Sequence, residues 1–226
     1  MQIINLTKLQ PSIITYNTSF LLHLNQLREI WLFNCSQGCQ HYFGQKKIKI
    51  NQISKIVITS LSIDNISGLL GLLSSLSLID RKKALHIYSP KGLDKYIELG
   101  KKYSQTNFRY NLYLHTLVTG LIINHRLYQV YALNDTISFN FFIISQEKFG
   151  KFQCFKAQQF NLAEGPLYGK LKQGSDLLLP DGFIMHTENF TYPNNSGKQV
   201  SFIHNRYNRR NSVEISQQSV LFQDVL

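Results

Sequence analysis

The sequence predicts an α/β fold, and three observations support that prediction. Short β-rich runs alternate with helical patterns in the first half of the chain, and the middle third is rich in strand-forming runs. Hydrophobic residues make up 43% and aromatic residues 12% of the 226 residues, which supplies a folded core and excludes a disordered chain. Strand, loop, helix, strand, turn and helix in succession are typical of a sheet covered by helices.

The expected elements follow from the spacing of apolar residues. Strands are expected where β-branched and aromatic residues gather, at 12–24, 29–33, 55–59, 85–88, 112–118, 127–133, 137–144 and 199–203. Helices are expected where leucines and other apolar residues recur at helical spacing, at 66–78 and 93–102. The stretch 146–181 has an irregular pattern, richer in Gly and Lys, and no strongly specified element is expected after Arg210.

The charge balance favours a polyanionic partner. Lys and Arg number 24 against 13 Asp and Glu, which gives a net charge of +11. Nucleic acid is the first candidate for such a basic chain and an anionic membrane surface the second. An AT-rich coding sequence, which favours Ile, Asn, Lys, Tyr and Phe, is an alternative source of the same charge. No targeting segment and no membrane span are expected.

The cysteines and histidines indicate little chemistry by themselves. Three cysteines, Cys35, Cys39 and Cys154, are too few for a disulfide framework and favour a reducing compartment. Cys35 and Cys39 lack the second Cys or His pair that a zinc finger needs. The seven histidines are dispersed, and neither a G-x-S-x-G motif nor a Walker-type loop occurs. The informative segment is 55–73, KIVITSLSIDNISGLLGLL, which runs from a strand through a polar loop into a helix.

This segment resembles the ribonuclease Z family, the 3′-tRNA-processing endoribonucleases of the metallo-β-lactamase fold. The family reads I-T-H-x-H-x-D-H-I-x-G-L-P-G-L-L there, and this chain agrees at Ile58, Thr59, Asp64, Ile66, Gly68, Leu69, Gly71, Leu72 and Leu73. Three further stretches agree in order: WLFNCSQGCQ at 31–40, LHIYSPKGLDKYIE at 85–98, and GPLYGKLKQG at 165–174 followed by LPDG at 179–182. The resemblance implies a metallo-β-lactamase-like αββα sandwich, C-terminally shortened, as a single domain over 1–226 with a protruding arm-like insertion over about 146–182.

The resemblance also implies two zinc ions held by histidines and aspartates, which supply a metal-bound hydroxide that attacks the phosphodiester. In this sequence three motif histidines are replaced by Ser60, Ser62 and Asn65, and Asp64 remains. Hydroxyl and amide groups are poor zinc ligands beside imidazole. The sequence therefore predicts that the zinc centre is lost and that no cofactor is bound.

Two looser alignments concern the remaining ligands. They place Asp135 at another histidine position and Asn205 at the position of the metal-bridging aspartate. Asp64 and Asp135 would at best hold an oxygen-liganded ion such as magnesium, and solvated or loop-capping aspartates are the alternative interpretation.

The 165–174 motif belongs, in the family, to an arm that grips the tRNA elbow. Gly165 and Pro166 are expected to set a tight turn, Tyr168 to offer a stacking face, and Lys170 and Lys172 to reach phosphates. An ordinary exposed hairpin loop with solvated lysines is the alternative. Further basic clusters could extend a phosphate-binding surface or be solvated faces: Lys46, Lys47 and Lys49; Arg81, Lys82 and Lys83; Arg206, Arg209 and Arg210.

Three functions stay open at this stage. The first is a non-catalytic ribonuclease Z-like protein that binds tRNA or precursor tRNA, as a homodimer or paired with an active homologue. The second is an active metal-dependent endoribonuclease or phosphodiesterase that uses Asp64 and Asp135. The third is a relic whose charge reflects codon bias alone. The composition and the expected lack of a targeting segment favour the plastid stroma, with a bacterial cytoplasm as the alternative.

Overall fold

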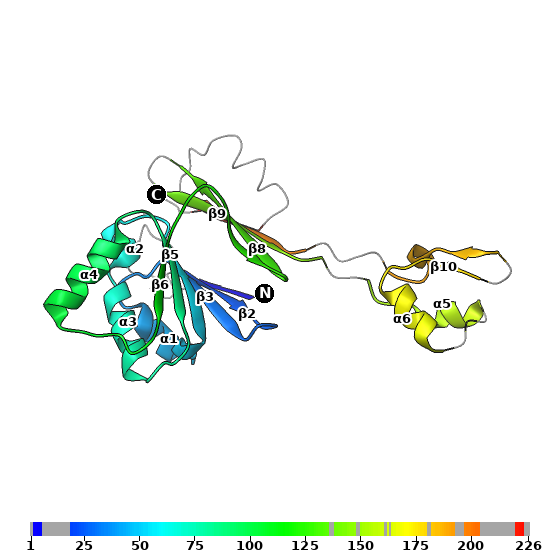
Figure 1. The fold of residues 1–226 in the computed structure, drawn as a ribbon, viewed down its shortest axis with the longest axis horizontal. Coiled ribbons are helices and arrows are strands. Elements are labelled where there is room, and N and C mark those ends of the chain that lie inside the picture. The colour runs from blue at the N-terminus through cyan, green and yellow to red at the C-terminus, as the bar shows by residue number, and fades with distance from the viewer. Residues whose placement is uncertain are drawn as a thin grey trace. The chain divides into compact units, whose positions relative to one another are not determined.

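The computed structural model describes most of the chain: residues 2–5, 19–135, 138–147, 150–160, 162, 164–179, 182–192, 197–203 and 220–223. These residues form two compact units (Figure 1). The first comprises Met1–Asn124, Val130–Ile143 and Val200–Leu226, and the second His125–Gln129 and Ile144–Gln199. None of the described helices is long and apolar enough to cross a membrane.

The first unit is built on a six-stranded sheet in the order β1-β2-β3-β4-β5-β6. Its strands are β1 (Gln2–Asn5), β2 (Phe20–Leu24), β3 (Glu29–Phe33), β4 (Ile53–Val57), β5 (Leu85–Ser89) and β6 (Leu112–Thr116). The first three pair antiparallel, and β3 to β6 pair parallel. Parallel strands need crossover connections, and helices supply them here.

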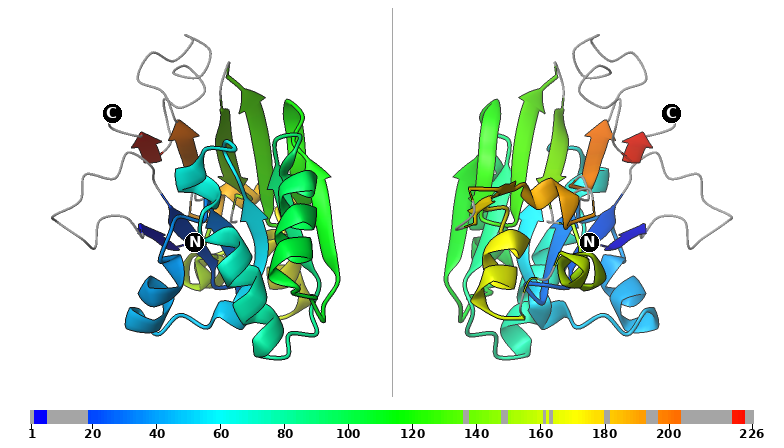
Figure 2. Two further views of the ribbon diagram at one scale, coloured as in Figure 1. Left: turned by 90° about the vertical axis from the view of Figure 1, so that its left-hand side faces the viewer. Right: turned by 90° about the vertical axis from the view of Figure 1, so that its right-hand side faces the viewer.

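Those helices cover one face of the sheet, as Figures 1 and 2 show. They are α1 (Cys39–Gln45), α2 (Ile63–Ile66), α3 (Leu69–Leu78) and α4 (Leu93–Ser104), with a short 3₁₀ turn, η2, at Ile50–Gln52. Leu72, Leu73 and Leu76 of α3 pack with strand residues such as Ile56 and Ile87 in one buried cluster. A register shift between Ile30 and Trp31 against β4 lets Ile53 and Ile56, three positions apart, both join that cluster.

A second sheet packs on the opposite face, in the order β13-β12-β9-β8-β7. Its strands are β7 (Gly120–His125), β8 (Tyr128–Asn134), β9 (Phe139–Ser145), β12 (Gln199–Ile203) and β13 (Val220–Gln223). Stacked phenylalanines join the sheets: the ring of Phe202 lies 3.7 Å from that of Phe20 and 5.1 Å from that of Phe33. The alternation of side chains along a strand places these rings opposite the helix-facing residues.

The second unit is small and carries α5 (Cys154–Gln159), α6 (Pro166–Lys172), β10 (Leu177–Leu178), β11 (Ile184–Met185) and a 3₁₀ turn, η3, at Thr187–Asn189. Its core is a compact set of side chains: Ala157, Leu162, Leu171, Met185 and Phe190.

Most sequence-based expectations agree with these elements, and the strand at 199–203 has the predicted bounds. The helix predicted over 66–78 is wrong as a single element, because the chain forms α2 and α3 with Gly68 between them. A Cβ at Gly68 would collide with the carbonyl oxygen of Ser36. The structure also shows elements that were not predicted, among them β1, α1, α5, α6 and β13. Residues 12–18 of the first predicted strand lie outside the described residues.

Candidate functional site

The candidate site is the loop that follows β4, at the carboxyl end of a buried parallel strand. Ile58 still donates a backbone hydrogen bond to Tyr88 at 2.8 Å, and the chain then leaves the sheet. Thr59 and Ser60 are both only 6% exposed, whereas Ser62 and Asp64 are exposed. The carboxyl ends of parallel strands are the usual place for ligand sites in α/β sheets.

Asn34 anchors this loop from the end of β3. Its Oδ1 accepts hydrogen bonds from the backbone nitrogen of Thr59 at 2.9 Å and from Thr59 Oγ1 at 3.0 Å. Cys35 adds two backbone bonds, donating to Asn65 at 2.7 Å and accepting from Gly68 at 2.9 Å. Two stretches that are separate in sequence, 31–40 and 55–73, thus form one polar cluster.

Asn65 joins the replaced histidine positions into a network. Its Nδ2 donates to Thr59 Oγ1 at 3.0 Å and to Ser60 Oγ at 2.8 Å, and Ser60 Oγ lies 3.1 Å from Ser62 Oγ. The Thr59 hydroxyl hydrogen is directed at Asn34, so its oxygen must accept, which fixes the orientation of the Asn65 amide. Asn65 is fully buried, and its Oδ1 meets no donor in the described part of the chain.

The two predicted carboxylates differ in their surroundings. Asp64 lies in the first turn of α2 and is exposed, whereas Asp135 is half-buried beside the start of β9. The backbone nitrogen of Asp135 donates to the carbonyl of Ser138 at 2.8 Å. The backbone nitrogen of Phe139, which follows Ser138, donates to the carbonyl of Thr59 at 3.0 Å. These bonds bring the Asp135 turn to the end of the sandwich that carries the loop. Asn205 lies outside the described residues.

The residues of this loop do not fit a zinc centre. Zinc takes thiolate, imidazole or carboxylate ligands, and here the three histidine positions carry two hydroxyls and an amide that bond to one another. Among the residues that the structure describes, no group of three His, Cys, Asp or Glu could hold a metal ion.

In the second unit, Gly165 and Pro166 begin a helix instead of the predicted tight turn. Pro166 occupies the first position of α6, where its missing N–H and fixed φ are favourable. The Tyr168 hydroxyl donates to the carbonyl of Leu162 at 2.9 Å, and its ring lies 5.0 Å from that of Phe152. Both parts of Tyr168 are engaged within the unit, and its role as a stacking face stays a prediction.

Lys170 and Lys172 are exposed in the last turn of α6. They flank Leu171, which is fully buried in the core of this unit. Residues two apart on a helix do not share a face, so the two ammonium groups extend from either side of α6. The segment is helical, so the hairpin loop of the alternative interpretation is wrong, whereas its solvated lysines agree with the exposure of both side chains. Phosphate contact by Lys170 and Lys172 stays a prediction.

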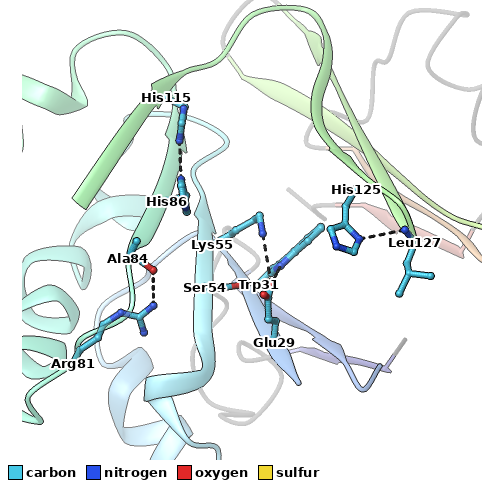
Figure 3. Close-up of polar contacts among 10 residues, drawn as sticks. All are labelled: Glu29, Trp31, Ser54, Lys55, Arg81, Ala84, His86, His115, His125 and Leu127. Atoms are coloured by element: carbon cyan, nitrogen blue, oxygen red, sulfur yellow. Dashed lines mark hydrogen bonds and ion pairs between the residues drawn. The ribbon is translucent and has the colours of Figure 1, made fainter. Parts of the chain in front are cut away.

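One predicted phosphate-binding residue proves to be structural. Arg81 is 1% exposed, and its guanidinium donates to the carbonyls of Asn51, Lys83 and Ala84 at 3.1, 2.7 and 2.9 Å. Figure 3 shows the bond to Ala84. Lys82 pairs with Asp80 at 2.8 Å. Arg206, Arg209 and Arg210 lie outside the described residues.

The sequence analysis missed a histidine pair on β5 and β6. Nδ1 of His86 lies 3.0 Å from Nε2 of His115 (Figure 3). The ring of Tyr113 stacks on that of His86, and the ring of Tyr88 stacks on that of His115. Burial and then the nearby His115 lower the pKa of His86. The pair becomes visible only from the parallel pairing of β5 with β6, which brings His86 and His115, 29 residues apart in the chain, onto the same face of the sheet.

A second unexpected cluster lies on the neighbouring strands β3 and β4 (Figure 3). It consists of Glu29, Trp31, Ser54 and Lys55. Glu29 accepts from Ser54 at 2.7 Å and from Trp31 Nε1 at 3.3 Å, and its carboxylate lies 3.5 Å from Lys55 Nζ. Burial raises the pKa of Glu29, but these donors and the Lys55 charge outweigh burial and the net pKa is lowered. Lys55 also lies 4.8 Å above the Trp31 ring.

Comparison with known proteins gives relatives over most of the chain, although no model of a protein family matches it. Proteins named "Uncharacterized protein ycf56" from Pyropia yezoensis and Porphyra purpurea are 38% and 36% identical, over 81% and 82% of this chain and 71% and 72% of their own lengths. Ribonuclease Z of Acaryochloris marina is 34% identical over 88% of this chain. The matched region spans 64% of that relative's length.

Two solved structures share the fold. The short form of human tRNase Z superposes with a TM-score of 0.55 at 23% identity, over 65% of this chain and 64% of that chain. A long-form RNase Z from yeast gives a TM-score of 0.54 at 16% identity, over 64% of this chain and 26% of that chain. The predicted metallo-β-lactamase-like α/β fold is confirmed.

Proposed function

The chain belongs to the ribonuclease Z family, and from this premise we propose that it binds tRNA or precursor tRNA without cleaving it. The observation that carries the proposal is the hydrogen-bonded network of Ser60, Ser62 and Asn65 at the positions of the motif histidines. A metal there would have to replace satisfied, partly buried hydrogen bonds with weak neutral ligands.

The binding half of the proposal rests on charge and exposure. The net charge is +11, and Lys170 and Lys172 project from α6 into solvent. Lysines that reach phosphate oxygens release counterions from the nucleic acid, so binding of this kind weakens steeply as salt rises. Phosphate contacts position an RNA and need no metal.

The same proposal includes a partner and a place of action. A protein that binds tRNA without cleaving it can act as a homodimer or as the partner of an active homologue. The ycf56 relatives from red algal plastids support the plastid stroma, with a bacterial cytoplasm as the alternative.

A second candidate is a metal-dependent endoribonuclease or phosphodiesterase that uses Asp64, Asp135 and an oxygen-liganded ion such as magnesium. The observation that favours it is Asn65 Oδ1, a buried oxygen without a donor in the described part of the chain. Amide and carboxylate oxygens are the ligands that hard cations prefer.

One experiment separates the two candidates. Purified protein is incubated with a 3′-extended precursor tRNA in the presence of zinc or magnesium, and RNA cleavage, RNA binding and metal content are measured together. The proposal expects bound, uncleaved RNA at low salt and substoichiometric zinc. Cleavage that Asp64→Ala abolishes would establish the second candidate, and protein that binds no tRNA at low salt would refute the binding half.

A further inference from the structure

A groove in the first unit lies at the far end of β3 from Asn34 and the candidate site. It runs between the β2–β3 turn and the residues that follow α1, and its volume is about 470 Å³. Ligand pockets in proteins commonly measure about 300 to 1,000 Å³. Because β3 runs from Glu29 to Phe33 at about 3.3 Å per residue, the groove and the candidate site are separated by the length of a strand.

The rim of the groove is strongly basic. Four cations line it, Arg28, Lys46, Lys47 and Lys49, and none of the lining residues that the structure describes is acidic. These side chains make no ion pair with any described carboxylate. Like charges gathered around one cavity repel one another, and an anion placed between them relieves that repulsion.

Two of these cations occupy unusual backbone positions. Arg28 and Lys47 both have φ of 52°, in the left-handed region that Gly, Asn and Asp adopt most easily. Each therefore places a long cationic side chain beside the groove at a turn where glycine would be less strained.

The interior of the groove combines apolar and polar side chains. Its floor is aliphatic. The half-buried side chains of Ile4 and Ile48 form the exposed part of that floor, packed over the buried Leu21 and Ile30, and they suit a flat apolar ring face. Three polar side chains also line it, His23, Asn25 and Gln52, and none bonds to another described side chain. An acyl chain would leave those groups unpaired and a bare phosphate would leave the floor uncovered, whereas a nucleobase uses both.

We propose that this groove binds a phosphorylated nucleotide, either free or at the end of an RNA chain. The base lies on the aliphatic floor with its edge toward the amides, and the phosphates meet the basic rim. This site is separate from the lysines of α6, and the inference does not depend on tRNA binding by the second unit.

Binding is tested on the full chain by isothermal titration with three kinds of probe: the four nucleoside 5′-triphosphates, a 5′-phosphorylated tetraribonucleotide, and inorganic tripolyphosphate. At least one nucleotide probe should bind about tenfold more tightly than tripolyphosphate, because only it contacts the floor. Binding of the oligonucleotide alone assigns the ligand to an RNA end, and binding of free triphosphates assigns it to a nucleotide.

Variants locate the binding in the groove. Arg28→Gln with Lys47→Gln should weaken it about tenfold. The control pair Lys95→Gln with Lys102→Gln removes equal charge from exposed lysines of α4 and should leave binding within about twofold. Ile48→Trp fills the groove without a change of charge and should block binding, with circular dichroism as the check that it folds.

Lys170→Ala with Lys172→Ala should leave nucleotide binding intact even where tRNA binding is lost. Three results would overturn the proposal. The first is tripolyphosphate binding as tightly as the nucleotides, and the second is an equal loss of nucleotide affinity in the control pair. The third is that no nucleotide probe binds at millimolar concentration.

Discussion

The side-chain oxygen of Asn34 accepts two hydrogen bonds from Thr59, at 2.9 Å from its backbone nitrogen and 3.0 Å from its hydroxyl. Asn34 is 2% exposed, so neither bond has water as a substitute. Its φ of 53° is a conformation that asparagine tolerates better than most residues. One residue thus supplies both the backbone turn after β3 and the support for the site loop.

Replacing Asn34 with alanine should destabilise the protein by about 1–3 kcal/mol, because two buried donors of Thr59 lose their acceptor. The measurement is the free energy of unfolding from urea denaturation. Asn34→Gly removes the same amide but relieves the left-handed backbone, so it should cost less than Asn34→Ala. Asn51→Ala, at an exposed position, is the control, and equal effects at both positions would contradict the assigned role of Asn34.

Arg81 should matter for stability and not for RNA. Arg81→Met leaves three backbone carbonyls without their donor, and we expect a loss of at least about 2 kcal/mol in the free energy of unfolding. Arg81→Lys should rescue little, because one ammonium cannot reproduce the planar fork. Lys83→Ala, which alters an exposed neighbour, is the control and should leave the free energy of unfolding nearly unchanged. A fall in tRNA affinity without a loss of stability would return Arg81 to a phosphate-binding role.

The three cysteines should differ sharply in reactivity. Cys35 and Cys39 are fully buried with their sulfurs 3.4 Å apart, and Cys154 is exposed. The contact with Cys39 and then burial raise the pKa of Cys35, whereas the contact with Cys35 lowers the pKa of Cys39. Burial of both sulfurs keeps a reagent away whichever of them holds the proton. A thiol reagent should therefore modify Cys154 rapidly and the other two only after unfolding in urea. Rapid modification of all three thiols in native buffer would contradict the packing of α1.

The histidine pair should make the protein less stable in mild acid. The pKa of His86 is lowered in the folded state by burial and by His115, so the unfolded chain takes up the proton more readily. Stability is then lost as pH falls through the unfolded-state value of about 6.5 toward the lower folded value. Urea denaturation at about pH 7.5 and about pH 5.5 measures this loss. The loss of stability between these two pH values should be smaller in His86→Gln than in the unmodified protein. It should be unchanged in His41→Gln, which alters an exposed histidine of α1.

The sequence was most informative where local pattern and fold agree. Apolar runs predicted the strands around Ile30 and Ile56, and the 55–73 motif identified the loop that carries Ser60 and Asn65. Long-range pairing was not accessible in the same way, since His86 and His115 become neighbours only through the register of β5 and β6. Charge alone could not separate a buried cation from a solvated one, which is why Arg81 was grouped with surface lysines.

The segment of α6 shows a different limit. Its glycines and lysines indicated an irregular stretch, yet Pro166 at the first helical position and the buried Leu171 were sufficient to form a short helix. Packing of Leu171 against the small core outweighed the weak local propensity. This outcome changes the expected arrangement of Lys170 and Lys172, because a helix separates two side chains that a flat loop would present together.

Lys170→Ala and Lys172→Ala should therefore each weaken tRNA binding, with effects that add. Each substitution removes one phosphate contact on its own side of α6, so each should lower the slope of log affinity against log salt by about 1. Fluorescence anisotropy with labelled tRNA over a salt series gives both the affinity and the slope. The control is Lys95→Ala with Lys102→Ala, which removes the same charge from exposed positions of α4 in the first unit and should leave the slope nearly unchanged. Effects that saturate at the first substitution would show that one lysine carries the contact, and an unchanged slope in the double variant would remove α6 from the RNA-binding surface.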